Sequence, residues 1–293
     1  MKGREMMMDS KIAKKKNILP SEIKANIYDS VEIIVDIHGI TKMDIETVLP
    51  KLDKILPAEN YSRTDDSLTV EEINDYGDRR DYSLSISARK RYLDTENVIR
   101  YYSKNFSEKV TISRLFISIY LSYEIAHDLK SNINLMGQLV QAFNDLAYFE
   151  VEKIYLIKKD SIYCSSLYRM YQCFDKKMFA DAGYQLFLQK KQTDTGVTRV
   201  YNNFTYDAAE IILNKEIITG MIADSEDLIY GGRLETIISK EPTGDTISVE
   251  EVLTELNKIS FEIFICHITD AFARDLMNGK SDKVRKGLNY YEE

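Results

Sequence analysis

The chain has 293 residues, of which 44% are hydrophobic and 29% charged, and a formal net charge of −8. This composition is that of a folded protein that is neither disordered nor membrane-spanning. No apolar run approaches the roughly 18 residues of a membrane span, and the N-terminus lacks the apolar stretch of a secretory signal. We therefore expect a cytoplasmic protein with no membrane partner. The negative charge disfavours a general nucleic-acid binder, because phosphate contacts need a basic surface.

Residues 1–20 contain clustered lysines and few apolar residues, and we expect them to form a mobile basic tail. The rest, 21–293, is predicted to be a single α+β domain. A run rich in β-branched residues predicts a strand over 31–37. Thr41 then caps a predicted helix over 42–56, which Pro50 should kink or shorten. The polar stretch 57–81 is predicted to be a long loop or an exposed hairpin.

The middle of the chain changes to a period of two, which is typical of strands. Apolar residues alternate with polar ones over 82–88 and again over 111–125, and the second segment is predicted to be one long strand. Further predicted elements follow in chain order: a helix over 129–146, a strand over 151–158, a helix over 166–179, and strands over 184–190, 197–206, 211–218 and 228–240.

The last long element is predicted to be one continuous helix over 248–277. Ser248 and Glu251 have the spacing of a capping box, and Gly279 lies where glycine commonly ends a helix. Apolar residues recur every three or four positions between them, which predicts one buried face. Such a helix needs a broad surface to lie on, so we expect a largely antiparallel sheet with helices on one face.

One internal similarity suggests a duplication. The segments 46–55 and 250–259 agree at six of ten positions, and each follows a predicted strand through a short loop. Two related halves, 21–146 and 147–293, would explain the agreement. Convergence of two amphipathic helices on the same letters is the alternative.

The most suggestive motif for chemistry is Asp36-Ile-His38-Gly39 at the end of a predicted strand. Asp36 and His38 share a face of an extended chain, as two metal ligands would. The run 35–39 resembles the first metal-binding motif of calcineurin-like metallophosphoesterases, which implies a metal-dependent phosphoesterase or nuclease. Such a site needs several further histidine and asparagine ligands, and the chain has three histidines in all and no Gly-Asn-His segment. We therefore expect Asp36 and His38 to be structural, and we predict no catalytic residue, metal or cofactor.

A basic and tyrosine-rich region, 78–104, is the best candidate for a binding surface. Arginines can attract an acidic partner and tyrosines can add contact area or stack on bases. The candidate partner-binding residues are Arg79, Arg80, Arg89, Arg91, Tyr82 and Tyr92. A nucleic-acid-binding protein that uses this region is the second alternative function, although the net charge does not favour it.

The segment Phe264-Ile-Cys-His-Ile-Thr-Asp270, with Arg274, is similar to the end of a sporadically distributed, uncharacterised family of bacterial proteins. The order of predicted elements is similar too, but the family's Arg–Gly–Leu–Arg run is replaced by 152–158, which has no glycine. The resemblance implies no catalytic residue and suggests a bacterial or phage origin near mobile or defence genes. Our leading hypothesis is a non-catalytic protein-interaction component, an accessory or sensor subunit that binds a protein partner, itself, or both.

Overall fold

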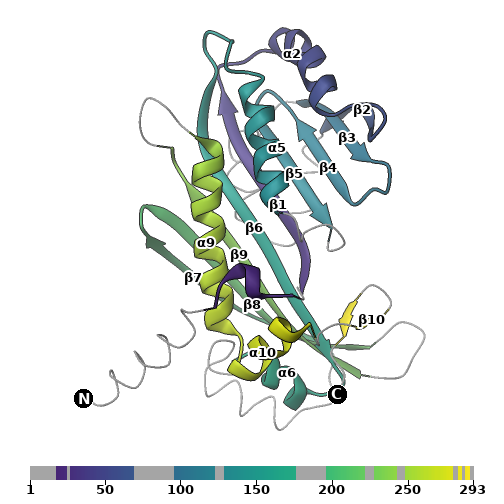
Figure 1. Ribbon diagram of the computed structural model, residues 1–293, viewed down its shortest axis with the longest axis vertical. Helices are drawn as coiled ribbons and strands as arrows, with labels where there is room; N and C mark the ends of the chain where they lie inside the picture. Colours follow the sequence, from purple (N-terminus) through teal and green to yellow (C-terminus); the bar gives the residue numbers. More distant parts are fainter. Residues whose placement is uncertain are drawn as a thin grey trace.

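A computed structural model describes residues 18–24, 27–68, 96–122, 129–175, 196–221, 228–242, 248–279, 283–285 and 288–290. The fold is α+β, as predicted: an antiparallel sheet with the strand order β2-β3-β4-β5-β1-β6-β9-β8-β7 carries the described helices on one face (Figure 1). The strands of this sheet are β1 (Tyr28–His38), β2 (Tyr61–Leu68), β3 (Glu96–Ser103), β4 (Glu108–Ile112), β5 (Phe116–Ser122), β6 (Glu150–Cys164), β7 (Gly196–Tyr206), β8 (Ala209–Met221) and β9 (Leu228–Lys240).

The helices are α2 (Lys42–Ile55), α5 (Leu129–Gln141), α6 (Leu167–Cys173), α9 (Val249–His267) and α10 (Asp270–Asn278), preceded by a 3-10 turn, η1 (Pro20–Glu22). A short hairpin of β10 (Lys283–Arg285) and β11 (Leu288–Tyr290) joins the sheet where Tyr290 pairs with Tyr163. Among the described helices, none combines the length and apolar character needed to cross a membrane. The predicted strands 82–88 and 184–190 and nearly all of the predicted tail lie outside the described residues.

The start of the domain follows the sequence closely. Every second residue of β1 from Val31 to Ile37 is buried under the helices, as its apolar pattern requires. Gly39 ends the strand with a φ of +81°, and a Cβ there would lie 1.5 Å from the carbonyl oxygen of Tyr148. Thr41 caps α2 and forms a capping box with Asp44. The helix continues through Pro50.

Two predicted elements are each divided in the structure. The predicted strand 111–125 is interrupted by a turn between β4 and β5, where the Ser113 hydroxyl accepts hydrogen bonds from the amides of Leu115 and Phe116 at 3.1 Å. Apolar and polar residues continue to alternate across this turn, so the sequence pattern did not reveal the turn. The predicted loop or hairpin 57–81 contains β2, and its partner β3 was not predicted.

The predicted helix 248–277 is also two helices. Ile268 is extended and forms an isolated bridge with Phe174, and Thr269 caps α10 by accepting a hydrogen bond from the amide of Phe272 at 3.2 Å. The Thr269 hydroxyl donates to the carbonyl of Gln172. At this break, helical hydrogen bonds are therefore replaced by contacts with Gln172 and Phe174, which follow β6 in the chain. The capped start at Ser248 and the left-handed Gly279 are as predicted.

The element order repeats in the two halves of the chain. Each half has an opening strand, a helix, an antiparallel meander and a closing helix: β1, α2, β2–β5 and α5, then β6, α6, β7–β9 and α9. In each half the opening strand pairs with the last strand of the meander, and the two opening strands pair antiparallel at the centre of the sheet. The similar segments 46–55 and 250–259 occupy different places in this order, α2 and α9. The duplication into 21–146 and 147–293 remains a prediction, which the element order motivates.

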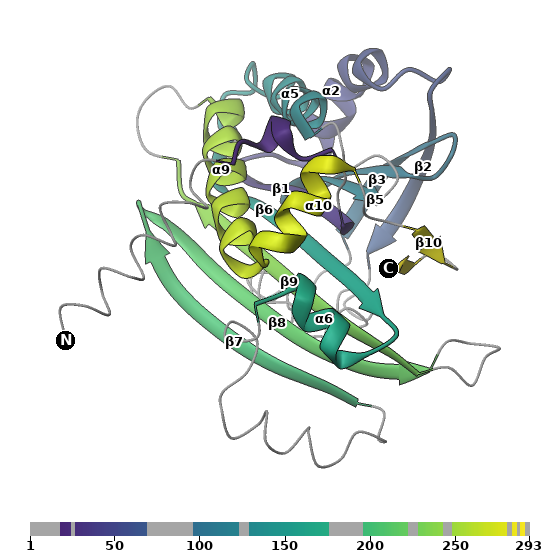
Figure 2. The same cartoon turned by 60° about the horizontal axis from the view of Figure 1, so that its bottom comes forward.

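The core between helices and sheet has two parts. The larger cluster lies under α2, α5 and the first part of α9, and it includes Leu52, Met136 and Leu256. The smaller cluster lies under α6 and α10 and includes Phe174 and Phe272. Figure 2 shows both sets of helices lying over the same side of the curved sheet.

Candidate functional site

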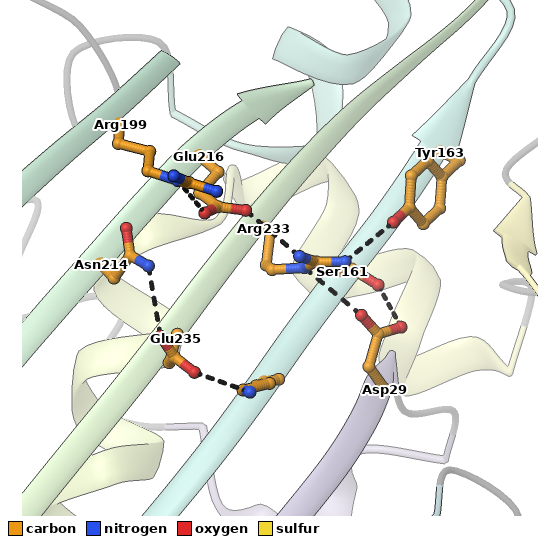
Figure 3. A network of polar contacts seen from close by, with 9 residues as sticks. Asp29, Ser161, Tyr163, Arg199, Asn214, Glu216, Arg233 and Glu235 are labelled. Carbon is orange, nitrogen blue, oxygen red and sulfur yellow. Dashed lines mark hydrogen bonds and ion pairs between the residues drawn. The ribbon is translucent and has the colours of Figure 1, made fainter. Parts of the chain in front are cut away.

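The face of the sheet that the described helices leave uncovered carries a chain of charged side chains across β1, β6, β9, β8 and β7 (Figure 3). The strand register explains why they meet. Arg199 of β7 is paired with Glu216 of β8, Glu216 with Arg233 of β9, and Arg233 with Ser161 of β6, so their side chains project from one face. We call Asp29, Ser161, Tyr163, Arg199, Glu216 and Arg233 the Arg233 network.

Glu216 is the anion that joins the two arginines of this network. Its side chain is 6% exposed, with one carboxylate oxygen 2.6 Å from Nε of Arg199 and the other 3.2 Å from Nη1 of Arg233. Arg233 also donates to the Tyr163 hydroxyl at 3.2 Å and lies 3.5 Å from the carboxylate of Asp29. Burial raises the pKa of the Tyr163 hydroxyl, so this group is a neutral phenol at physiological pH.

A second set of polar contacts lies next to this network on the same face. The carboxylate of Glu235 is 3.0 Å from Nζ of Lys159 and accepts a hydrogen bond from the Asn214 amide at 3.2 Å. Cations and anions alternate from strand to strand, and each carboxylate in these contacts meets a cation. The arrangement fixes the register of β6 to β9. Within the Arg233 network, the buried Ser161 hydroxyl donates a hydrogen bond to the carboxylate of Asp29.

The helix-covered face contains a buried charged pair between the two core clusters. Lys158 and Asp160 follow one another on the inner face of β6, and Nζ of Lys158 donates to Asn257 of α9 at 2.6 Å and to the Tyr28 hydroxyl at 3.3 Å. Burial lowers the pKa of Lys158 to about 8 and raises that of Asp160 to about 7, and the opposite charge of each limits the other's shift. Shifted pKa values mark functional sites in many proteins, and structural ion pairs produce them as well.

The predicted metal motif is divided between a buried and an exposed residue. Asp36 is 4% exposed on the uncovered face of the sheet, beside Tyr155. His38 is at the end of β1, where its Nε2 is 2.9 Å from the carboxylate of Glu150 and its side chain is 52% exposed. Within the described residues, no group of three or more histidines, cysteines or carboxylates is placed to hold a metal ion. His267 is buried, and its Nδ1 contacts the carbonyl of Ile263 at 2.8 Å.

The structure does not describe the predicted partner-binding residues. Arg79, Arg80, Arg89, Arg91, Tyr82 and Tyr92 all lie outside the described residues. Their surface therefore remains a prediction.

The structure places a different candidate binding surface at the outer edge of β7. This strand has 11 residues and pairs with β8 on one side, and no described strand lies on its other side. Arg199 is its single charged residue. Three large side chains of β7 are well exposed, Tyr201 at 45%, Phe204 at 43% and Tyr206 at 57%. We call the outer side of Gly196–Tyr206, with these side chains, the β7 edge.

The turn after β7 determines which backbone groups point outward. Asp207 and Ala208 form a two-residue turn with φ values of +50° and +60°, the left-handed geometry of a type I′ hairpin. Tyr206 and Ala209 are then the hydrogen-bonded pair that closes the ladder. Hydrogen-bonded and non-bonded pairs alternate along antiparallel strands, so the amides and carbonyls of Arg199, Asn203 and Thr205 point away from β8. The sequence predicted this strand but not its position at the edge.

Comparison with known proteins adds no assignment, since the chain matches no protein-family model and no curated protein. The function is therefore argued from the geometry of this chain alone.

Proposed function

We propose that this protein is a non-catalytic interaction component that binds a protein partner by adding a strand to the β7 edge. One observation carries the proposal: among the described strands, β7 ends the sheet with 11 residues, a single charge and three exposed aromatic side chains. Outward backbone groups supply hydrogen bonds to an added strand, and alternate side chains supply selectivity. Aromatic residues are also enriched at protein interfaces.

The charged face of the sheet supports this role in a second way. The Arg233 network ties β7 to the sheet interior through the 2.6 Å contact between Arg199 and Glu216. A docking edge that is held rigidly loses little conformational freedom when a partner binds. The Arg233 network therefore positions the β7 edge. The charges of the network already pair with one another.

The proposed setting is a cytoplasmic accessory or sensor subunit of a bacterial defence or mobile-element system. This part rests on the resemblance of the segment that contains Phe264, Thr269 and Asp270. No feature of Asp36 and His38 favours the phosphoesterase or nuclease alternative, because one is buried and the other engages Glu150.

A proline in the strand tests the proposal. The amide of Asn203 points away from β8, so Asn203→Pro removes an outward donor and leaves the β7–β8 ladder complete. The tagged full-length chain should retain a protein partner from an extract of its source cells, and the Asn203→Pro chain should lose it. Met43→Ser, which changes an exposed apolar residue on α2 (76% exposed), is the matched control and should retain the partner.

A second variant tests the assignment of the outward side. Phe204 is predicted by the same alternation to bond to β8, so Phe204→Pro should lower the thermal midpoint whereas Asn203→Pro should leave it nearly unchanged. Capture by a folded Asn203→Pro chain equal to that of the unaltered chain would overturn strand addition at this edge.

A further inference from the structure

The β7 edge is compatible with a symmetric arrangement in which two identical edges pair. We infer that the strand added to the β7 edge is β7 of a second copy of this chain, antiparallel, with a two-fold axis passing beside Asn203. The inference rests on the proposed function, and it names the partner. Two-fold contacts use one surface twice, so the strand must be complementary to itself.

The register follows from the charges. With Asn203 opposite its own copy, Tyr201 lies opposite Thr205 and Arg199 lies opposite Asp207. Arg199 is the one cation of β7, and Asp207 is the exposed anion of the turn that ends it. Arg199 contacts Glu216 through Nε, and its side chain is 42% exposed, so its terminal nitrogens can reach a carboxylate beyond the edge. Both ends of the paired strands then join opposite charges. Centring the pair on Tyr201 would place Arg199 opposite Asn203 and lose this match.

The same register brings Phe204 and Tyr206 of both copies together on the other face of the joined strands. Phe204 and Tyr206 project toward the helix-bearing side, since they are paired with Ile211 and Ala209 of the buried core. Tyr206 then lies opposite Val200 of the second copy, and the two copies of Phe204 are diagonal neighbours. Aromatic and β-branched residues in such positions stabilise antiparallel pairs, and diagonal aromatic side chains can touch.

A second copy also matches the edge in neutrality. In this register β7 residues 200–206 of the two copies overlap, so the outward amides and carbonyls of Tyr201, Asn203 and Thr205 are paired, whereas those of Val197 lie beyond the overlap. No like charges are opposed, because each strand carries one charge. The interface is a single strand pair with six aromatic rings, three from each copy, which places it among the small, transient contacts. The dimer should therefore dissociate on dilution.

Cysteine substitution at the axis tests this pairing in the full-length chain. Directly opposite residues of a hydrogen-bonded antiparallel pair have Cα atoms about 5.5 Å apart, within the range that a disulfide spans. Asn203→Cys should therefore give a disulfide-linked dimer in oxidised glutathione, as two thiols become one disulfide while glutathione disulfide is reduced. Thr205→Cys is the matched control: the two copies of residue 205 would be about 13 Å apart along the strands, so it should stay monomeric. The unaltered chain reports any background from its own cysteines.

The outcomes separate the two proposals. Two results together would support the pairing. Asn203→Cys should cross-link while Thr205→Cys by itself does not, and a mixture of Tyr201→Cys and Thr205→Cys chains should cross-link. Equal cross-linking of Asn203→Cys and Thr205→Cys, or none in either with a monomer by sedimentation up to high concentration, would overturn it. If a chain so shown to be monomeric still loses another captured protein through Asn203→Pro, only the second-copy inference fails. If Asn203→Pro changes neither capture nor self-association, the proposed function fails too.

Discussion

The two edge strands of the described sheet, β2 and β7, differ in their charge. A free edge strand is a template for another strand, and proteins often protect it with charges. At one edge, β2 has eight residues, including Arg63, Asp65 and Asp66. Arg63 reaches back to Asp53 of α2 at 3.0 Å. At the other edge, β7 has one charge in 11 residues and turns it inward to Glu216. The contrast motivates the proposal that the β2 edge resists pairing and that the β7 edge permits it.

The largest effect should come from removing the anion that holds β7. Glu216→Ala leaves Arg199 and Arg233 facing one another on the sheet, and we expect a loss of about 2–4 kcal/mol, somewhat below that of a fully buried pair because both arginines keep contact with solvent. Glu210→Ala on the same strand, where an exposed carboxylate meets Lys153, should cost less than about 1 kcal/mol. Denaturant titration of the two variants measures the difference, and equal midpoints would contradict the role of Glu216.

The stability should depend on pH through Asp160 and Lys158 of β6, a strand that lies between the two edge strands. Asp160 has a raised pKa when folded, about 7 against an ordinary 3.8, so the folded state holds a proton that the unfolded state has lost between these values. Stability should therefore fall as the pH rises from about 4 to 7, by an amount on the order of a few kcal/mol. The lowered pKa of Lys158 acts oppositely: stability should rise between about pH 8 and its ordinary 10.5. Asp160→Asn should abolish the fall below pH 7, and an unchanged profile would argue against it.

A substitution beside the charged edge strand, β2, should lower the stability by a smaller amount. Asp53 accepts from Arg63 and from the Tyr101 hydroxyl, the latter at 2.9 Å, and its side chain is 47% exposed. Asp53→Asn should lower stability by about 0.5–1.5 kcal/mol. It should leave self-association unchanged, since the other charges of β2 remain. Sedimentation and thermal melting test the two parts separately, and a new dimer would show that this single pair protects the edge.

The smallest effect concerns the turn of the β7–β8 hairpin. Ala208 has a φ of +60°, which an L-residue with a Cβ adopts at a cost. Ala208→Gly should raise stability by up to about 1 kcal/mol, because glycine adopts this conformation readily. Ala209→Gly, at a buried and extended position, should lower stability instead. If both substitutions shifted the thermal midpoint in the same direction, the strain at Ala208 would not be the cause.

Local patterns predicted much of this fold. The alternation in β1, the cap at Thr41 and the boundaries of β9 follow from interactions among near neighbours in the chain. The division at Thr269 was not predicted because it depends on a long-range contact, in which the Thr269 hydroxyl donates to the carbonyl of Gln172. The division at Ser113 is local, but apolar and polar residues continue to alternate across it.

The candidate site was less accessible to sequence reasoning. The position of a strand in a sheet depends on pairing across long stretches of chain, so the composition of β7 could not indicate that it lies at an edge. The Arg233 network joins residues from five strands, and no local spacing relates Asp29 to Arg199. The composition of β7 did indicate a possible binding strand: among the predicted strands of the second half, 197–206 combines a single charge with three aromatic residues.

Residue-resolved amide exchange at several protein concentrations tests the central claim most directly. In dilute protein, the amides of Asn202 and Phe204 should be protected by β8, whereas those of Asn203 and Thr205 should exchange rapidly. At high concentration, Asn203 and Thr205 should become protected as the two copies of β7 pair, while the amides of β2 keep their rates. Protection of Asn203 and Thr205 that is already complete in dilute protein, or that never appears at any concentration, would contradict an open β7 edge that binds its own copy.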